Sequence, residues 1–133
     1  MNNLTVTVET EVNSTESLEK VKLAVENIFG SVRFEVRERG RGSTLFAYAS
    51  GSESVTKFCN LLRRERIRDA ARKVLFHGLE GSTVSFCLNK QVAYAGHLSF
   101  SELEDESPLG PLKVTVTSDN PRELIDWLAP RTT

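Results

Sequence analysis

The sequence predicts an α+β domain, a two-layer sandwich with helices packed on one face of a largely antiparallel or mixed sheet. Several segments alternate apolar and polar residues, which is the pattern of strands with one buried face. Other segments repeat apolar residues at helical spacing and end at glycine or proline. The chain has 133 residues, which fits one domain over residues 1–133.

The first elements are a strand and a helix. Residues 3–12, NLTVTVETEV, alternate and predict a half-buried strand. Residues 13–30 carry an apolar stripe at helical spacing, with Ser14 or Thr15 as the expected N-cap. Gly30 is the expected stop, because glycine adopts the left-handed conformation that often ends helices.

A β-hairpin follows. Residues 31–38 and 44–50 alternate, and the RGRGS segment between them supplies a glycine-rich turn. We expect the apolar side chains of the first of these strands to face the core, namely Val32, Phe34 and Val36.

The region from Ser52 to Phe76 is helical in pattern but carries two apolar stripes. One contains Leu62 and the other contains Ile67. At about 100° per residue these stripes lie roughly 140° out of phase, so one straight helix cannot bury both against one sheet. We therefore predict a break or strong bend between Arg63 and Arg66.

The remaining chain predicts strands and a last helix. Residues 83–89 and 91–100 suggest a second hairpin turning near Asn89 and Lys90, and 112–118 predict another strand. The final helix has Asn120 as its N-cap and proline at its first turn. Its Trp127 lies next to apolar neighbours, and we interpret it as a core anchor.

Basic residues concentrate around the predicted bend. Glu65 and Asp69 lie among them, so a salt-bridged solvent face, with Glu65–Arg68 and Asp69–Arg72 or Asp69–Lys73 pairs, is the alternative to a phosphate-binding surface. The candidate nucleic-acid-binding residues are Arg63, Arg64, Arg66, Arg68, Arg72 and Lys73, with Arg33 and Arg37 as further candidates.

The sequence contains none of the common catalytic motifs. No GxxxxGK[ST], HExxH or GxSxG occurs. His77 is interpreted as a helix cap, and His97 has no nearby nucleophile in sequence. The acidic stretch Glu102–Glu106 lacks the spacing of a calcium loop and is interpreted as a solvent-exposed loop or a contact for a basic partner. We predict no catalytic residue, no metal site and no cofactor.

The signals of the common RNA-binding modules are weak. GLEG at 78–81 matches GxxG, but it contains an acid and precedes a strand. An RNA-recognition sheet needs aromatic side chains on its open face. Four aromatic residues of the predicted strands occupy the same alternate positions as the core aliphatic residues: Phe34, Phe86, Tyr94 and Phe100. The open face is therefore expected to offer few stacking platforms.

Composition sets further bounds. The net charge is −1, so any nucleic-acid binding must come from a local patch. Cys59 and Cys87 form no CxxC pair; one disulfide bridge is possible, but both are expected to be buried, reduced thiols of a cytoplasmic protein. No apolar run approaches the roughly 20 residues of a membrane span, so no membrane partner is expected.

The segments EKVKLAVENIF, LLRRERIRDAARKVL, FCLNKQVAYAG, SPLGPLKVTV and LIDWLAP resemble an uncharacterised archaeal protein family, over about residues 4–130. The resemblance implies a fold similar to the large-subunit ribosomal protein that binds 5S rRNA. Some relatives are fused to a phosphate-loop protein resembling dephospho-coenzyme A kinase. The family brings no set of site residues, and a shared fold alone does not establish RNA binding.

Three functional hypotheses remain open. The first is a non-enzymatic RNA-binding module that uses the candidate cations at the bend. The second is a protein-interaction or accessory domain, dimeric through its open sheet face or an edge strand, with a kinase-like protein as a candidate partner. A small enzyme is the third hypothesis.

Overall fold

The computed structural model describes residues 3–101 and 110–131. Its helices and strands alternate in short groups along the chain. In order they are β1 (Leu4–Val12), α1 (Leu18–Phe29), β2 (Arg33–Arg39), β3 (Gly42–Ser50), α2 (Glu53–Arg64), α3 (Arg68–His77), β4 (Leu79–Glu80), β5 (Thr83–Asn89), α4 (Lys90–Tyr94), β6 (Phe100–Ser101), β7 (Pro111–Ser118) and α5 (Pro121–Leu128).

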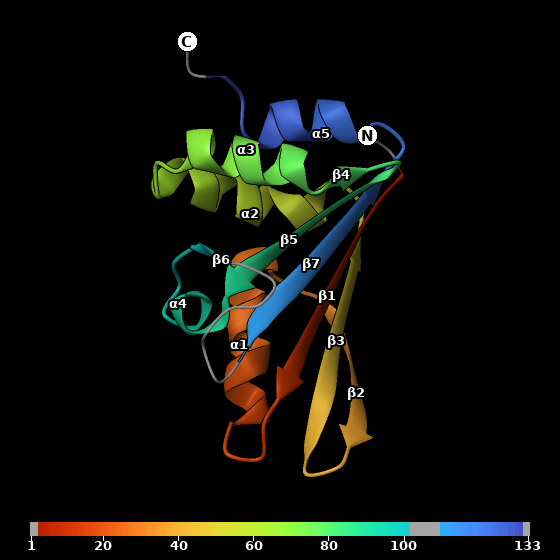
Figure 1. Ribbon diagram of the computed structural model, residues 1–133, viewed down its shortest axis with the longest axis vertical. Helices are drawn as coiled ribbons and strands as arrows, with labels where there is room; N and C mark the ends of the chain where they lie inside the picture. The colour runs from red at the N-terminus through yellow and green to blue at the C-terminus, as the bar shows by residue number, and fades with distance from the viewer. Residues whose placement is uncertain (1–2, 102–109, 132–133) are drawn as a thin grey trace.

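The strands form one antiparallel sheet in the order β2-β3-β1-β7-β5-β4, with β6 paired to β5. The helices lie together on one side of this sheet, and none of the helices in the described residues covers its other face (Figure 1). The predicted α+β class and two-layer arrangement are confirmed.

The core lies between the sheet and the helices. The apolar positions of β1 and β7 are buried in register, with Val6 across from Val116 and Val8 across from Val114. Aromatic rings fill the core between the helices and the sheet. The ring centroid of Phe58 on α2 lies 5.6 Å from that of Phe29 on α1 and 5.4 Å from that of Phe86 on β5. Burial of the alternating faces therefore fixes the strand register, because a one-residue slip would expose every apolar side chain.

The helix ends follow local capping chemistry. Asn120 caps α5 as predicted, and its side chain accepts a hydrogen bond from the Glu123 amide. The predicted cap of α1 is wrong: the side chain of Ser17, rather than Ser14 or Thr15, accepts from the Lys20 amide. A turn over residues 13–16, in which the Glu16 amide donates to the Asn13 carbonyl, delays the start of the helix.

The β2–β3 hairpin is confirmed, but one of its side chains is not where the alternation placed it. Phe34 packs against the core, whereas Val36 is 37% exposed. The reason is position in the sheet: β2 is an edge strand with only β3 beside it, so its side chains are covered from one side alone.

The predicted second hairpin is wrong. Residues 90–94 form the short helix α4, because the Asn89 side chain accepts from the Val92 amide and caps a helical turn. The chain returns to the sheet only at β6, where Phe100 pairs with Leu88. Tyr94 consequently lies on a helix and is 43% exposed rather than inward on a strand.

A buried ion pair holds α4 in place. The Lys90 side chain is 4% exposed, and its ammonium donates to the Glu11 carbonyl oxygen at 2.7 Å and to the Glu16 carboxylate at 3.2 Å. Burial lowers the pKa of Lys90, and the Glu16 carboxylate opposes this shift.

The prediction that Trp127 anchors the core is wrong. This residue of α5 is 40% exposed.

Candidate nucleic-acid interface

The predicted bend is confirmed. Helix α2 ends at Arg64, α3 begins at Arg68, and Arg66 between them has a left-handed backbone with φ of 57°. The turn lets both apolar stripes reach the core, and Leu62 and Leu75 are both fully buried. The two helices then lie alongside one another at one end of the molecule (Figure 1).

Two of the candidate arginines are bound within the fold. The Arg72 guanidinium donates to the Asp126 carboxylate at 2.8 Å and to the Ala129 carbonyl at 3.0 Å, and its side chain is 18% exposed. Arg72 thus joins α3 to α5, in place of the predicted pair with Asp69. The Arg64 guanidinium donates to the Gly96 carbonyl at 2.7 Å and joins α2 to the chain after α4.

Glu65 has partners other than Arg68, the cation that was expected to neutralise it. Its carboxylate contacts His97 Nδ1 at 2.8 Å and accepts from the Leu98 amide at 3.2 Å, so the predicted Glu65–Arg68 pair is wrong. The hydrogen bond from His97 lowers the pKa of this carboxyl, with the Leu98 amide adding to the shift. This contact gives His97 a structural partner.

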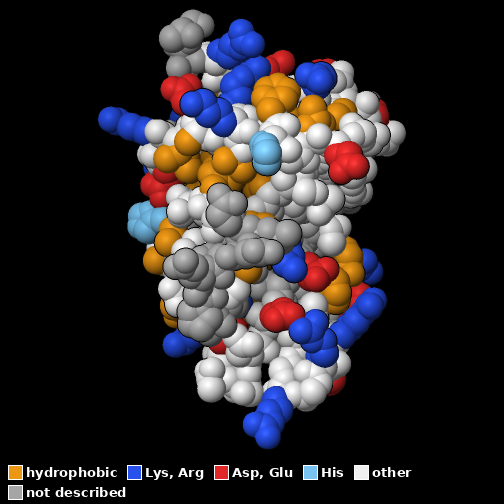
Figure 2. All heavy atoms as spheres, viewed as in Figure 1, with side chains coloured by type: hydrophobic (Ala, Val, Ile, Leu, Met, Phe, Trp, Pro, Cys, Tyr) orange, Lys and Arg blue, Asp and Glu red, His pale blue; other side chains and the backbone are white. Residues whose placement is uncertain are grey.

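The remaining candidate cations lie on α2, on α3 and in the turn between them, and we call them the bend cluster: Arg63, Arg66, Arg68 and Lys73. Arg68 is half-buried and the other three are exposed. Burial raises the pKa of the nearby Cys59 thiol, while Arg63 and Arg68 oppose that shift. Figure 2 shows Lys and Arg side chains gathered at the end of the molecule that carries α3 and α5, with Asp and Glu side chains between them.

The open sheet face holds the other two candidates together with aromatic side chains that the sequence analysis missed. Arg33 lies over the ring of Tyr48 at 5.1 Å, and Arg37 lies over the ring of Phe46 at 4.9 Å. The expectation of few stacking platforms is therefore wrong for this part of the sheet. The signal was present in TLFAYAS, where Phe46 and Tyr48 alternate with buried Leu45 and Ala47.

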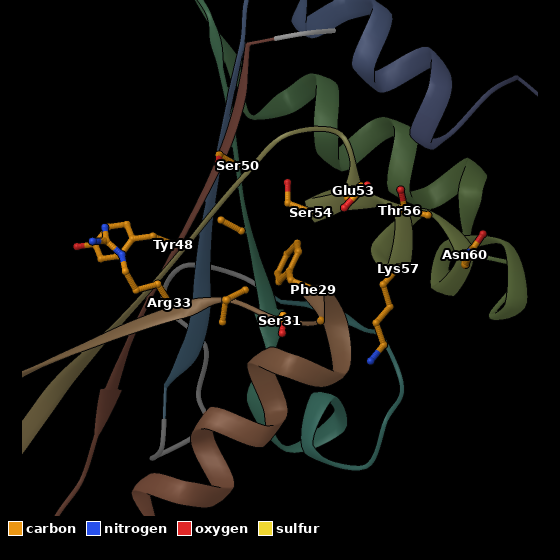
Figure 3. A pocket seen from close by; sticks show the side chains of 13 residues that line it. Phe29, Ser31, Arg33, Tyr48, Ser50, Glu53, Ser54, Thr56, Lys57 and Asn60 are labelled. Atoms are coloured by element: carbon orange, nitrogen blue, oxygen red, sulfur yellow. The ribbon is translucent and has the colours of Figure 1, made fainter.

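A hollow opens at the β2 edge of the sheet. It has a volume of about 780 Å³ and lies between the end of α1, the start of α2 and strands β2 and β3. In Figure 3, Lys57 and Asn60 extend from α2 on the helical side, whereas Arg33 and Tyr48 lie together on the outer side of the sheet. The Lys57 ammonium donates to the Glu26 carbonyl, so it also ties α2 to α1.

Other candidate chemistry finds little support. His77 is exposed in the last turn of α3, which agrees with its predicted position at a helix end. Within residues 3–101 and 110–131, no group of three or more His, Cys, Asp or Glu side chains is arranged to hold a metal ion. The predicted acidic loop, Glu102–Glu106, lies outside the described residues. No helix in the described parts of the chain is long and apolar enough to cross a membrane.

Known proteins match this chain along nearly its whole length. A UPF0201 protein of Sulfolobus acidocaldarius is 44% identical over 127 residues, which cover 96% of this chain and 88% of the relative. A UPF0201 protein of Saccharolobus islandicus is 43% identical with the same coverage. The crystal structure of a UPF0201 protein from Methanococcus jannaschii superposes with a TM-score of 0.87 at 32% identity, covering 97% of this chain and 95% of that one.

A family model described as RNA binding matches residues 5–118, a span that includes both the bend cluster and the open sheet face. The resemblance to an archaeal family that the sequence motifs suggested is confirmed. The chain belongs to the archaeal UPF0201 family, and to the family whose model is described as RNA binding.

Proposed function

We propose that this domain binds RNA without catalysing a reaction, and that the bend cluster contacts the phosphate backbone. The observation that carries the proposal is the left-handed turn at Arg66, which presents exposed cations at the junction of two helices. Residues other than glycine adopt this conformation at an energetic cost, and such strain concentrates at functional sites. The family match to an RNA-binding model supports the same conclusion.

The fates of the charged side chains support this assignment. Arg72 and Arg64 are bound to Asp126 and Gly96, so their role is to hold the helices. Glu65 is bound to His97 and so directed toward the chain after α4. Of the candidate cations on α2, α3 and the turn between them, the bend cluster remains for phosphate. Because the net charge is −1, attraction to RNA must be local and must fall steeply with salt.

The test is fluorescence anisotropy with a labelled RNA hairpin between about 50 and 200 mM salt. A triple variant, Arg63→Gln, Arg66→Gln and Lys73→Gln, removes three exposed cations. We expect the slope of log affinity against log salt to fall by about 2–3, because each phosphate contact contributes about 0.7–0.9. A control variant changes Lys20, Lys22 and Arg41 to Gln, which removes the same charge from α1 and the β2–β3 turn.

The two variants separate specific from general effects. An equal loss of RNA affinity in the bend-cluster variant and in the control variant would show that only overall charge matters. An unchanged salt slope in the bend-cluster variant would refute the proposed contact between the bend cluster and phosphate. Absence of binding by the unmodified protein at the lowest salt concentration would refute the proposed function itself.

An exposed tryptophan favours a second candidate function, a protein-interaction domain. Trp127 is 40% exposed on α5, and tryptophan is enriched among the residues that dominate binding energy at protein interfaces. A homodimer anchored by Trp127 would show a concentration-dependent mass in light scattering that Trp127→Ala abolishes. A constant monomer mass would contradict the dimer, and a pull-down tests a kinase-like partner separately.

A further inference from the structure

Four side chains on the open sheet face form a continuous surface that we call the stacking row: Arg33, Tyr48, Phe46 and Arg37. The rings of Phe46 and Tyr48 lie 6.4 Å apart with an angle of 8° between their planes. Each ring has one guanidinium over it, Arg33 over Tyr48 and Arg37 over Phe46. Two nearly parallel rings and two planar cations therefore follow one another along β3 and β2.

The backbone and one carboxylate hold this row in place. Arg33 is directly across from Tyr48 in the β2–β3 register, and Glu35 is across from Phe46. The Tyr48 hydroxyl donates to the Glu35 carboxylate at 3.4 Å, and the Arg37 guanidinium contacts the same carboxylate at 3.4 Å. Glu35 thus orients one ring and one cation, and its own charge is balanced by Arg37.

We propose that the stacking row binds unpaired bases of single-stranded RNA, with one base on each aromatic ring or its arginine. This inference rests on the proposed RNA binding and deepens it by naming the class of RNA. Proteins that read single strands on a sheet stack bases on aromatic rings and on guanidinium planes, because every base offers a π-face. Bases inside a duplex are not available for this contact.

The energetics allow a base to take the place of an arginine. An exposed cation–aromatic contact is worth about a two- to fivefold factor in equilibrium. A base stacked on an aromatic side chain is worth about five- to 150-fold. Arg37 is exposed, with 64% of its side-chain surface accessible, so it can move aside when a base stacks on Phe46.

Charge on this face separates the stacking row from the bend cluster. Positive and negative side chains alternate on this face. Along β2, Glu35 lies between Arg33 and Arg37. Across the sheet, Glu9 of β1 is in register with Phe46 of β3 and with Lys113 of β7. Few counterions are then released on binding, so affinity from the stacking row depends weakly on salt. A protein partner is disfavoured as the occupant, because the row is flanked by charged side chains rather than by an apolar patch.

The hollow at the β2 edge suggests the path of a bound RNA single strand beyond the stacking row. Arg33 and Tyr48 lie at its rim, and Asn60 and Lys57 line its helical side (Figure 3). A single strand that runs along the row from Phe46 to Tyr48 would reach this hollow next. Its amide and ammonium groups suit the polar edge of a base or a phosphate.

The experiment compares a labelled single-stranded RNA of mixed sequence with an RNA duplex, by anisotropy at about 50 and 200 mM salt. We expect Tyr48→Leu and Phe46→Leu each to weaken single-strand binding about tenfold, by the same factor at both salt concentrations, and to leave duplex binding unchanged. Tyr48→Phe keeps the ring and should bind single strands as the unmodified protein does.

Tyr94→Leu is the matched control. Tyr94 is also exposed and has the Lys20 ammonium 5.7 Å from its ring centroid, but it lies on α4 in the helical layer. Its replacement should leave both RNA affinities unchanged. Circular dichroism and urea midpoints establish that each variant is folded before its affinity is compared.

Three results would overturn the inference. Single-strand affinity could stay unchanged in folded Tyr48→Leu and Phe46→Leu, it could fall equally for duplex RNA, or Tyr48→Phe could lose as much as Tyr48→Leu. If the bend-cluster variant keeps its salt slope while the stacking-row variants lose single-strand affinity, the phosphate contact is refuted and the stacking row is supported. No binding of either RNA by the unmodified protein would refute the proposed function and this inference together.

Discussion

Replacement of Arg66 by glycine should make the domain more stable and a weaker RNA binder. Arg66 has φ of 57°, and among the described residues no other non-glycine has positive φ. The left-handed conformation costs an ordinary residue about 1–2 kcal/mol. Glycine removes that cost but adds about 0.5–1 kcal/mol of backbone entropy to the unfolded chain. The difference predicts a gain of about 0.75 kcal/mol in the free energy of unfolding at the middle of both ranges, and of at most about 1.5 kcal/mol.

The same replacement removes one cation from the bend cluster. The loss of one phosphate contact should lower RNA affinity roughly fivefold at about 0.1 M salt. Urea denaturation followed by circular dichroism measures stability, and hairpin anisotropy measures binding. Arg66→Ala is the matched control, because it loses the same charge but keeps the left-handed strain, so its stability should stay within about 0.5 kcal/mol of the unmodified protein.

A glycine variant that is less stable than the alanine variant would refute the argument from backbone strain. An unchanged affinity in both variants would show that Arg66 does not contact phosphate. The expected opposite signs of the two effects would mean that an arginine is retained at the bend at the expense of stability, as strained functional positions require.

Three further predictions concern contacts that hold the site's framework. Lys90→Met should cost about 3–5 kcal/mol in urea denaturation, because it leaves the Glu16 carboxylate buried without its cation, and adding Glu16→Leu should recover much of that loss. Gly78→Ala should destabilise the fold by more than about 2 kcal/mol, or prevent folding, because a Cβ there would lie 1.8 Å from a backbone oxygen of β5. Contact with His97 lowers the pKa of Glu65, so its stabilising contribution is complete above the ordinary glutamate pKa of about 4.3 and is lost as pH falls below it; Glu65→Gln should flatten the pH dependence of the urea midpoint in that acid range.

Local patterns predicted most of the fold. Alternation placed β1, β2, β3, β5 and β7, and the phase difference between the stripes around Leu62 and Ile67 placed the bend. Helix α4 was missed because Asn89 was interpreted as a turn residue rather than as an N-cap, and because the contact that holds this short helix in place is distant in sequence. The Lys90 ammonium donates to Glu11 and Glu16, which lie more than 70 residues earlier in the chain.

The candidate site was less predictable, because side-chain partners depend on which elements become neighbours. Helical spacing suggested that Arg72 and Glu65 would pair within their own helix, but both reach other elements, Asp126 on α5 and His97 after α4. Likewise Arg33 and Tyr48 meet only because β2 pairs with β3 in one particular register. Spacing along a chain limits which pairs can form locally, whereas the sheet order decides which distant pairs form.

The sequence by itself determined the fold class, the break at Arg66 and the concentration of cations around it, because periodicity and charge are local properties of the chain. Only the tertiary structure decided which of those cations remain at the surface and which hold helices together. It also decided that Phe46 and Tyr48 lie beside arginines, since the strand neighbours of an aromatic residue are set by long-range pairing.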